Sequence, residues 1–170
     1  MSMDYYVELI YRYQGKGILI DTNLLLVYFI GSYDSSLISK FKCTLAFTLE
    51  DFYLLERVFN FFKRIVTTPN ILTEVNSLAN QLPQNIKLSY YTTMAQHISR
   101  LEEHYLTSIK LCSLDHFIKF GLADSAIIEL VKGKYLVLTD DFRLANYLQT
   151  VNIDVINFNH IRAQNWGIFS

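Results

Sequence analysis

The feature that most constrains the fold is a set of short apolar runs that end at polar or acidic residues. "ILIDTN", from Ile18 to Asn23, and "YLVLTDD", from Tyr135 to Asp141, are the clearest examples. Runs of this length with polar boundaries are typical of buried strands. "IVTT" at 65–68 and "IDVINF" at 153–158 repeat the pattern. The sequence therefore predicts four short buried strands.

Segments with helical periodicity lie between these strands. We expect helices over 6–13, 24–30, 52–62, 91–105, 120–134 and 142–149, and one that begins at Pro69 with Thr68 as its cap. Gly31 is expected to end the helix over 24–30, and Tyr105 is expected in the core as part of the helix over 91–105. Alternating strands and helices favour an α/β fold in which helices cover both faces of a parallel sheet.

Composition fits one domain spanning residues 1–170, with residues 1–17 as an N-terminal helical extension. The chain is 51% hydrophobic and carries a formal net charge of −1. It therefore lacks the global basic field of many nucleic-acid-binding proteins, although divalent cations can neutralise phosphates locally. No signal peptide or membrane-spanning segment is expected, and Cys43 and Cys112 do not have metal-ligand spacing. These features indicate a cytoplasmic protein.

Carboxylates occupy positions where an apolar pattern would favour other residues. Asp21 follows the first strand, Glu74 lies beside the apolar stripe of its helix, and Asp124 lies among apolar residues. Asp140 and Asp141 follow a later strand. Most have a structural alternative: the strand-end acids, or Asn23, could cap the next helix, and Glu74 could be a solvated helix residue. A cap or surface role does not explain Asp124.

The positions of these acids favour a shared site. Ligands of parallel α/β sheets bind at the carboxyl ends of the strands, where the acids are expected to meet. Carboxylates gathered at one point repel one another unless cations are present. Because the set contains no His or Cys, we expect Mg²⁺ or Mn²⁺ rather than zinc. Such a site suits phosphoryl chemistry.

Four motifs in order resemble those of PIN domains, and of VapC-type ribonuclease toxins within that family: "ILIDTNLLL", "TTPNILTEV", "GLADSAIIEL" and "VLTDDFRLA". The resemblance covers about residues 18–158. It implies a three-layer α/β/α sandwich with a central parallel sheet. It also implies an endoribonuclease that uses Mg²⁺ or Mn²⁺ and a metal-activated water and leaves a 5′-phosphate.

Residue by residue, the resemblance implies four catalytic and metal-binding acids: Asp21, Glu74, Asp124 and Asp141. The T-x-D spacing from Thr139 selects Asp141 as the fourth, with Asp140 as a competing metal ligand. Asn23 and Thr139 match supporting polar positions. Arg143 lies one helical turn from the acids, where it could contact an RNA phosphate.

Alternatives remain open at this point. A non-catalytic PIN-like module could bind RNA or protein, and a haloacid dehalogenase-type phosphatase also has an Asp after its first strand. The phosphatase needs a second Asp where this chain has Asn23. Beyond RNA, the expected partners are an antitoxin-like protein and a second copy of the chain. His97 and His104 are expected to be solvated helix residues.

Overall fold

The computed structural model describes residues 3–162 and contains a five-stranded parallel sheet, which confirms the predicted α/β class. The strands are β1 (Ile18–Ile20), β2 (Ile65–Thr67), β3 (Glu102–Glu103), β4 (Leu136–Thr139) and β5 (Val155–Asn157). Their order in the sheet is β3-β2-β1-β4-β5, and every neighbouring pair is parallel. Parallel sheets are usually covered on both faces, as the apolar strands require.

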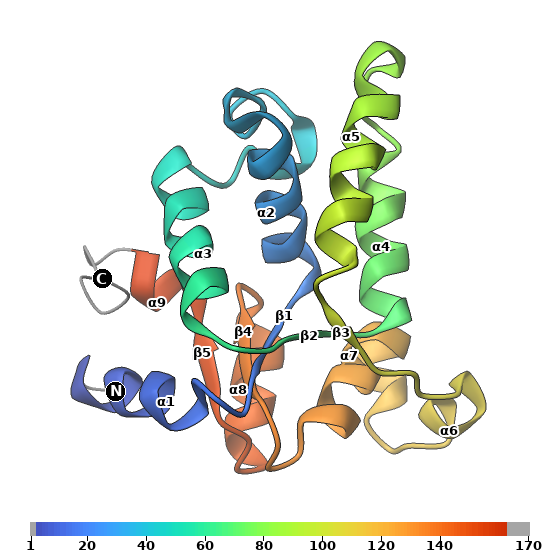
Figure 1. The fold of residues 1–170 in the computed structure, drawn as a ribbon. Helices are drawn as coiled ribbons and strands as arrows, with labels where there is room; N and C mark the ends of the chain where they lie inside the picture. The colour runs from blue at the N-terminus through green and yellow to red at the C-terminus, as the bar shows by residue number, and fades with distance from the viewer. Residues whose placement is uncertain (1–2, 163–170) are drawn as a thin grey trace.

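Helices cover the sheet in two layers (Figure 1). On one side lie α2 (Thr22–Asp34), α3 (Leu49–Phe61), α4 (Pro69–Ala79) and α5 (Gln84–Ile98). On the other lie α7 (Phe117–Val131) and α8 (Phe142–Thr150). Two further α-helices, α6 (Ser108–Cys112) and α9 (Phe158–Arg162), and two 3₁₀ turns, η1 (Ser35–Leu37) and η2 (Lys42–Thr44), complete the connections after α1 (Met3–Tyr13). This arrangement matches the expected three-layer sandwich.

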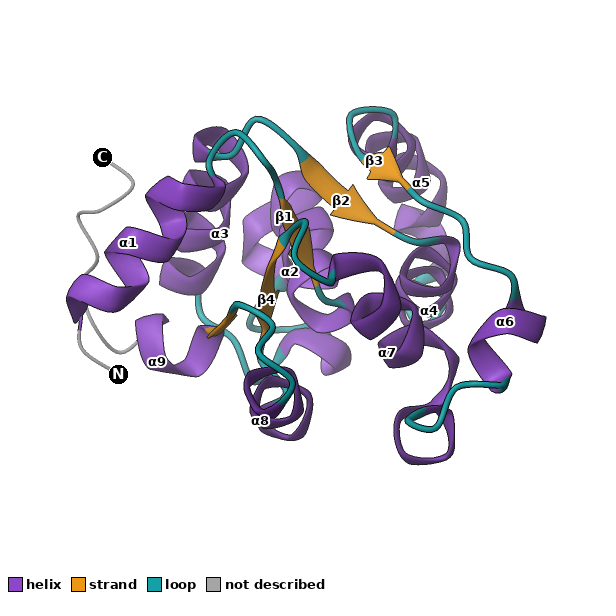
Figure 2. Cartoon of the chain, turned by 90° about the horizontal axis from the view of Figure 1, so that it is seen from below, coloured by secondary structure: helices purple, strands orange, loops and turns teal. Residues whose placement is uncertain are grey.

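The order of the strands creates a switch point between β1 and β4. From β1 the chain proceeds to β2 and β3 in one direction, and β4 then returns to the opposite side of β1. Ile20 pairs with Leu138, and the backbone N–H of Asp21 donates to the Leu138 carbonyl at 3.0 Å. The two acid-ended strands are therefore neighbours, and Figure 2 shows β1 and β4 side by side. Ligand sites of α/β sheets form at such points.

The N-terminal helix α1 belongs to the main core. Leu9 and Ile10 are fully buried within the same hydrophobic cluster as β1 and β4. The Tyr13 hydroxyl donates to Oδ2 of Asp154 at 2.9 Å, which joins α1 to the segment before β5. Residues 3–13 of the predicted extension are thus helical, and they cover part of the apolar core.

The expected long helix over 91–105 is wrong at its C-terminal end. The α5 helix ends at Ile98, and residues 102–103 form the edge strand β3, so His104 also lies outside any helix. Tyr105, expected in the core, is 75% exposed. Leu101 and Tyr105 continue the helical spacing of apolar residues, which predicts one more helical turn. In the structure, residues 102–103 instead pair with strand β2 and extend the sheet.

Gly31 does not end α2, which continues to Asp34. A Cβ atom at Gly31 would lie 2.3 Å from the ring of Phe52. The glycine therefore permits close packing of α2 against α3, a role that a helix-terminator rule cannot distinguish from a stop signal.

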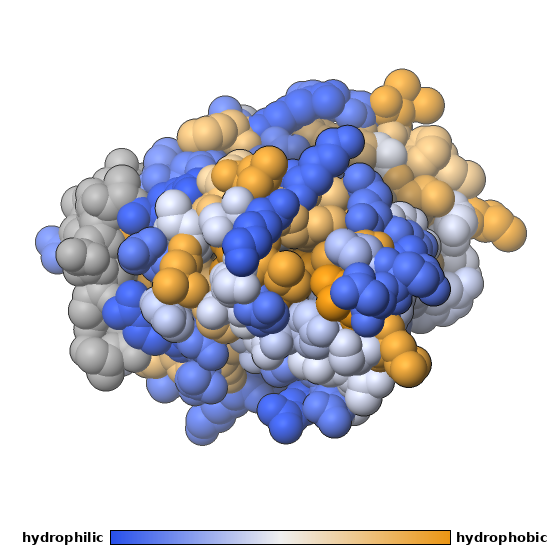
Figure 3. Space-filling view, turned by 90° about the horizontal axis from the view of Figure 1, so that it is seen from above, coloured by the Kyte–Doolittle hydropathy of each residue, from blue (hydrophilic) through white to orange (hydrophobic). Residues whose placement is uncertain are grey.

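No helix among residues 3–162 combines the length and hydrophobicity needed to cross a bilayer. On the face drawn in Figure 3, hydrophobic residues form small separate groups between hydrophilic ones.

Candidate functional site

Asp21 stands where β1 ends and α2 begins. Its Oδ1 accepts the backbone N–H of Thr22 at 2.7 Å, so it caps the helix, and its Oδ2 accepts the hydroxyl of Thr139. The residue is only 8% exposed. Burial raises the pKa of Asp21 to about 6, and the two hydrogen bonds oppose this rise while nearby Asp140 and Asp141 add to it.

Glu74 reaches the same region from α4. The helix begins at Pro69, with the Thr68 hydroxyl accepting the backbone N–H of Ile71 at 3.3 Å, as predicted. One turn later, Oε2 of Glu74 accepts the hydroxyl of Thr22 at 2.9 Å. Thr22 therefore connects the second acid to the first. Thr22 was not predicted as a site residue, although its position beside Asp21 at the start of a helix was the available signal.

Asp124 comes from α7, just after a break in that helix. Gly121 has φ +74°, a conformation that favours glycine, and the regular helix resumes beyond it. In the described part of the chain the Asp124 carboxylate accepts no hydrogen bond and forms no salt bridge. Its pKa is raised to about 7, mainly by burial and then by the charges of the other acids, with Arg143 opposing the rise.

Asp141 and Asp140 differ in their surroundings. Asp141 caps α8: its Oδ1 accepts the backbone N–H groups of Arg143 at 2.6 Å and Leu144 at 3.1 Å. Its own N–H donates to the Thr139 hydroxyl at 3.0 Å. Asp140 instead accepts the side-chain amide of Asn23, at 3.3 Å and 3.4 Å. Burial raises the pKa of Asp140 above its usual value.

One cleft of about 380 Å³ contains the four acids expected to act together. It is lined by Asp21, Thr22, Asn23, Thr73, Glu74, Ser77, Leu78, Asp124 and Asp141. The structure thus brings together acids that follow β1 and β4 and acids from α4 and α7, whereas Asp140 is not among the lining residues. Thr139 lies behind the cleft and hydrogen-bonds the first and last of these acids.

The acids are close enough to interact electrostatically but do not form a closed set of metal ligands. Within residues 3–162, no three His, Cys, Asp or Glu side chains are grouped closely enough to hold one metal ion together. The pKa of Asp124 nevertheless responds to three neighbouring carboxylates. Coulomb repulsion acts over longer distances than metal–oxygen bonds, so the two observations are compatible.

Arg143 contacts the first turn of α7. Its Nη2 donates to the Lys119 carbonyl at 2.6 Å, and its guanidinium lies 5.1 Å from the centroid of the Phe120 ring. His104 contacts Glu102 and Tyr135 near the sheet edge. These side chains are engaged with the protein itself.

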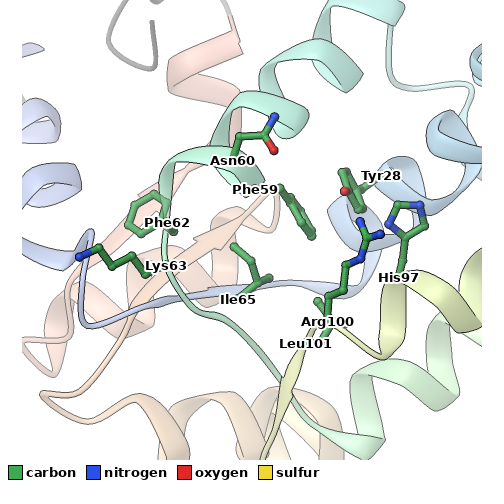
Figure 4. A pocket seen from close by; sticks show the side chains of 9 residues that line it. All are labelled: Tyr28, Phe59, Asn60, Phe62, Lys63, Ile65, His97, Arg100 and Leu101. Atoms are coloured by element: carbon green, nitrogen blue, oxygen red, sulfur yellow. The ribbon is translucent and has the colours of Figure 1, made fainter.

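A separate hollow of about 190 Å³ lies between α2, α3, α5 and the start of β2 (Figure 4). Stacked rings of Tyr28 and Phe59, 3.6 Å apart at their centroids, form one wall, and His97 meets Tyr28 edge-on. Figure 4 shows the Arg100 guanidinium beside Tyr28 and His97. None of the predicted acids lines this hollow.

No protein-family model matches the chain, and no similar curated protein was found.

Proposed function

We propose that the chain is a PIN-type endoribonuclease that hydrolyses RNA with the help of Mg²⁺ or Mn²⁺. The observation that carries the proposal is geometric: four acidic side chains from four separate segments line one cleft at the β1/β4 switch point. Helix capping accounts for Asp21 and Asp141 but not for Glu74 and Asp124. The burial of Asp21 and the repulsion among the carboxylates oppose folding unless cations or protons offset the charge.

The donor set fits a hard divalent cation. Carboxylate, hydroxyl and amide oxygens line the cleft, and no Cys or His of the described residues does. Mg²⁺ commonly takes one or two protein carboxylates and keeps several waters, so it does not require three converging acids. When bound, the ion would supply charge neutralisation for the phosphate and lower the pKa of water.

Asp21 and Asp141 would hold such an ion at the strand ends. Both carboxylates are fixed by helix-capping bonds, and Thr139 accepts from the Asp141 backbone while donating to Asp21. Rigid placement of this kind lowers the reorganisation needed during reaction. Thr22 similarly fixes Glu74 at the α4 side of the cleft.

Asp124 is suited to take a proton from the attacking water. Its carboxylate has no competing hydrogen bond within residues 3–162, and burial, the main cause of its raised pKa in the metal-free protein, favours a proton acceptor near neutral pH. Water oxygen would bond to phosphorus as the bond to the 3′-oxygen breaks. The leaving 3′-oxygen then receives a proton from solvent water, and the products carry a 5′-phosphate and a 3′-hydroxyl.

The test is metal-dependent cleavage of RNA by the purified full chain. We expect cleavage of single-stranded or structured RNA with Mn²⁺ or Mg²⁺ and none with EDTA. Asp21→Asn should lower the rate by at least about a hundredfold, because a neutral amide binds a hard cation poorly. Asp115→Asn is the matched control, since Asp115 is exposed and does not line the cleft. Equal rates for Asp21→Asn and wild type in a nuclease-free preparation would refute the proposal.

A further inference from the structure

Tyr105 is an exposed aromatic side chain beside the acid cleft. It lies between β3 and α6 and is 75% exposed. Single exposed hydrophobic residues are common and need no explanation by themselves. This one, however, lines a hollow of about 360 Å³.

The hollow adjoins the acid cleft. Its lining consists of Pro69, Asn70, Thr73, Glu74, Tyr105, Leu106, Ser108, Leu122 and Ala123. Thr73 and Glu74 line both spaces. An RNA strand with one phosphate among the acids would therefore place a neighbouring nucleotide at this hollow.

The charge of the hollow argues for a base rather than a phosphate. Among the described residues, Glu74 is the only carboxylate in its lining, and no Lys, Arg or His is present there. A phosphate would meet repulsion without compensation, whereas a neutral base would not. The volume also falls in the range of about 300–1,000 Å³ that ligand pockets occupy.

The walls of the hollow offer both kinds of contact that a nucleobase makes, stacking on its flat ring and hydrogen bonds to its polar edge. Leu106, Leu122 and the Tyr105 ring supply apolar and aromatic surface for stacking. Asn70 and Ser108 supply polar groups, and neither side chain has a hydrogen-bond partner in the described part of the chain. Stacking on an aromatic ring with a few adaptable polar contacts is a common way to bind single-stranded nucleic acid.

We propose that this hollow is a nucleobase subsite in which Tyr105 stacks on a base of single-stranded RNA next to the scissile phosphate. The inference rests on the proposed ribonuclease function and adds the part of the protein that contacts bases. It assigns substrate positioning to Tyr105, not a chemical step.

Binding can be measured separately from cleavage. In EDTA the proposed enzyme does not cut, so fluorescence anisotropy with a labelled uridine oligomer reports affinity for the intact full chain. Tyr105→Leu should weaken binding by about tenfold, the effect of losing one stacked base. Tyr105→Phe should bind like wild type, because it keeps the ring. Tyr53→Leu, which removes another exposed tyrosine on α3, is the control and should have no effect.

An oligomer without bases supplies the second readout. It keeps the phosphates, so Tyr105→Leu and wild type should bind it equally weakly. In the presence of Mn²⁺, Tyr105→Leu should raise KM with little change in kcat.

The outcomes separate the subsite from the proposed function. If wild type cuts RNA but Tyr105→Leu binds the uridine oligomer as tightly as wild type, the subsite is wrong and the nuclease function stands. If Tyr105→Leu lowers the affinity for the baseless oligomer as much as it lowers the affinity for the uridine oligomer, Tyr105 does not act by stacking on a base and the inference also fails. A wild type that neither binds nor cuts RNA overturns both.

Discussion

Asp124→Asn should stabilise the metal-free protein, and it should do so by more at pH 8 than at pH 5. The pKa of Asp124 is raised from 3.8 to about 7, with burial as the main cause and three neighbouring acids adding to it. Because the folded pKa is the higher one, protonation favours the folded state. This contribution is complete below the unfolded pKa of 3.8 and is lost as the pH rises through about 7.

The difference in stabilisation between pH 8 and pH 5 follows from the part of the Asp124 pKa shift that lies between these two pH values. From pH 5 to the folded pKa of about 7 is about two units, or about 2.7 kcal/mol at 1.36 kcal/mol per unit. Asp124 is partly solvated, so screening reduces the expected gain to about 1–2 kcal/mol. The Asn side chain keeps the shape and carries no charge. The stabilisation of the variant relative to wild type should therefore be larger at pH 8 than at pH 5 by that amount.

Urea unfolding in EDTA at both pH values measures the difference. Asp115→Asn makes the same chemical change at an exposed position and should leave the free energy of unfolding within about 0.5 kcal/mol of wild type. Asp21 contributes to the pH dependence of the unfolding free energy in all three proteins, so its contribution largely cancels when the variants are compared with wild type. A variant that loses about 1–3 kcal/mol at pH 8 would refute the reasoning, because a hydrogen-bonded structural Asp124 predicts that sign.

Two further pairs of substitutions test the fourth acid of the cleft and the packing of α2 against α3. Asp141→Asn should reduce metal-dependent cleavage of RNA more than Asp140→Asn does, because only Asp141 lines the cleft; equal losses in kcat would contradict the assignment. Gly31→Ala should lower the free energy of unfolding by about 1–3 kcal/mol, because its Cβ would lie 2.3 Å from the Phe52 ring. Gly15→Ala, where nothing lies within 4 Å of the added carbon, is the control in the same urea assay, and a similar loss there would discount the packing argument.

Local patterns were sufficient where the signal is local. A buried run followed by an acid located β1 and the start of α2, so the sequence alone predicts that Asp21 stands at a strand end. The same holds for Asp141 after β4. Strand ends in a parallel sheet meet at one edge, and this topological rule needs no knowledge of side-chain packing.

Contacts made by packing could not be predicted in this way. The bond between Thr22 and Glu74 joins residues 52 positions apart and depends on how α2 lies against α4. The strand β3 has only two residues, both Glu, so its apolar signal is absent. Tyr105 was misplaced for the related reason that helical spacing continued beyond the end of the helix.

Asp21 and Asp141 each cap a helix and also line the acid cleft. Asp21 could be either a cap or a site residue on sequence grounds, and the structure shows that it caps α2 while lining the acid cleft. The positive end of a helix favours a carboxylate at that position. Asp21 is more buried than Asp124, yet its pKa rises only to about 6 instead of about 7, because hydrogen bonds from Thr22 and Thr139 oppose the rise. Asp124 lacks such bonds within residues 3–162, so it retains most of the electrostatic penalty of its charge. Neutralising Asp124 by a proton, a cation or a substitution should therefore stabilise the fold more than neutralising Asp21 does.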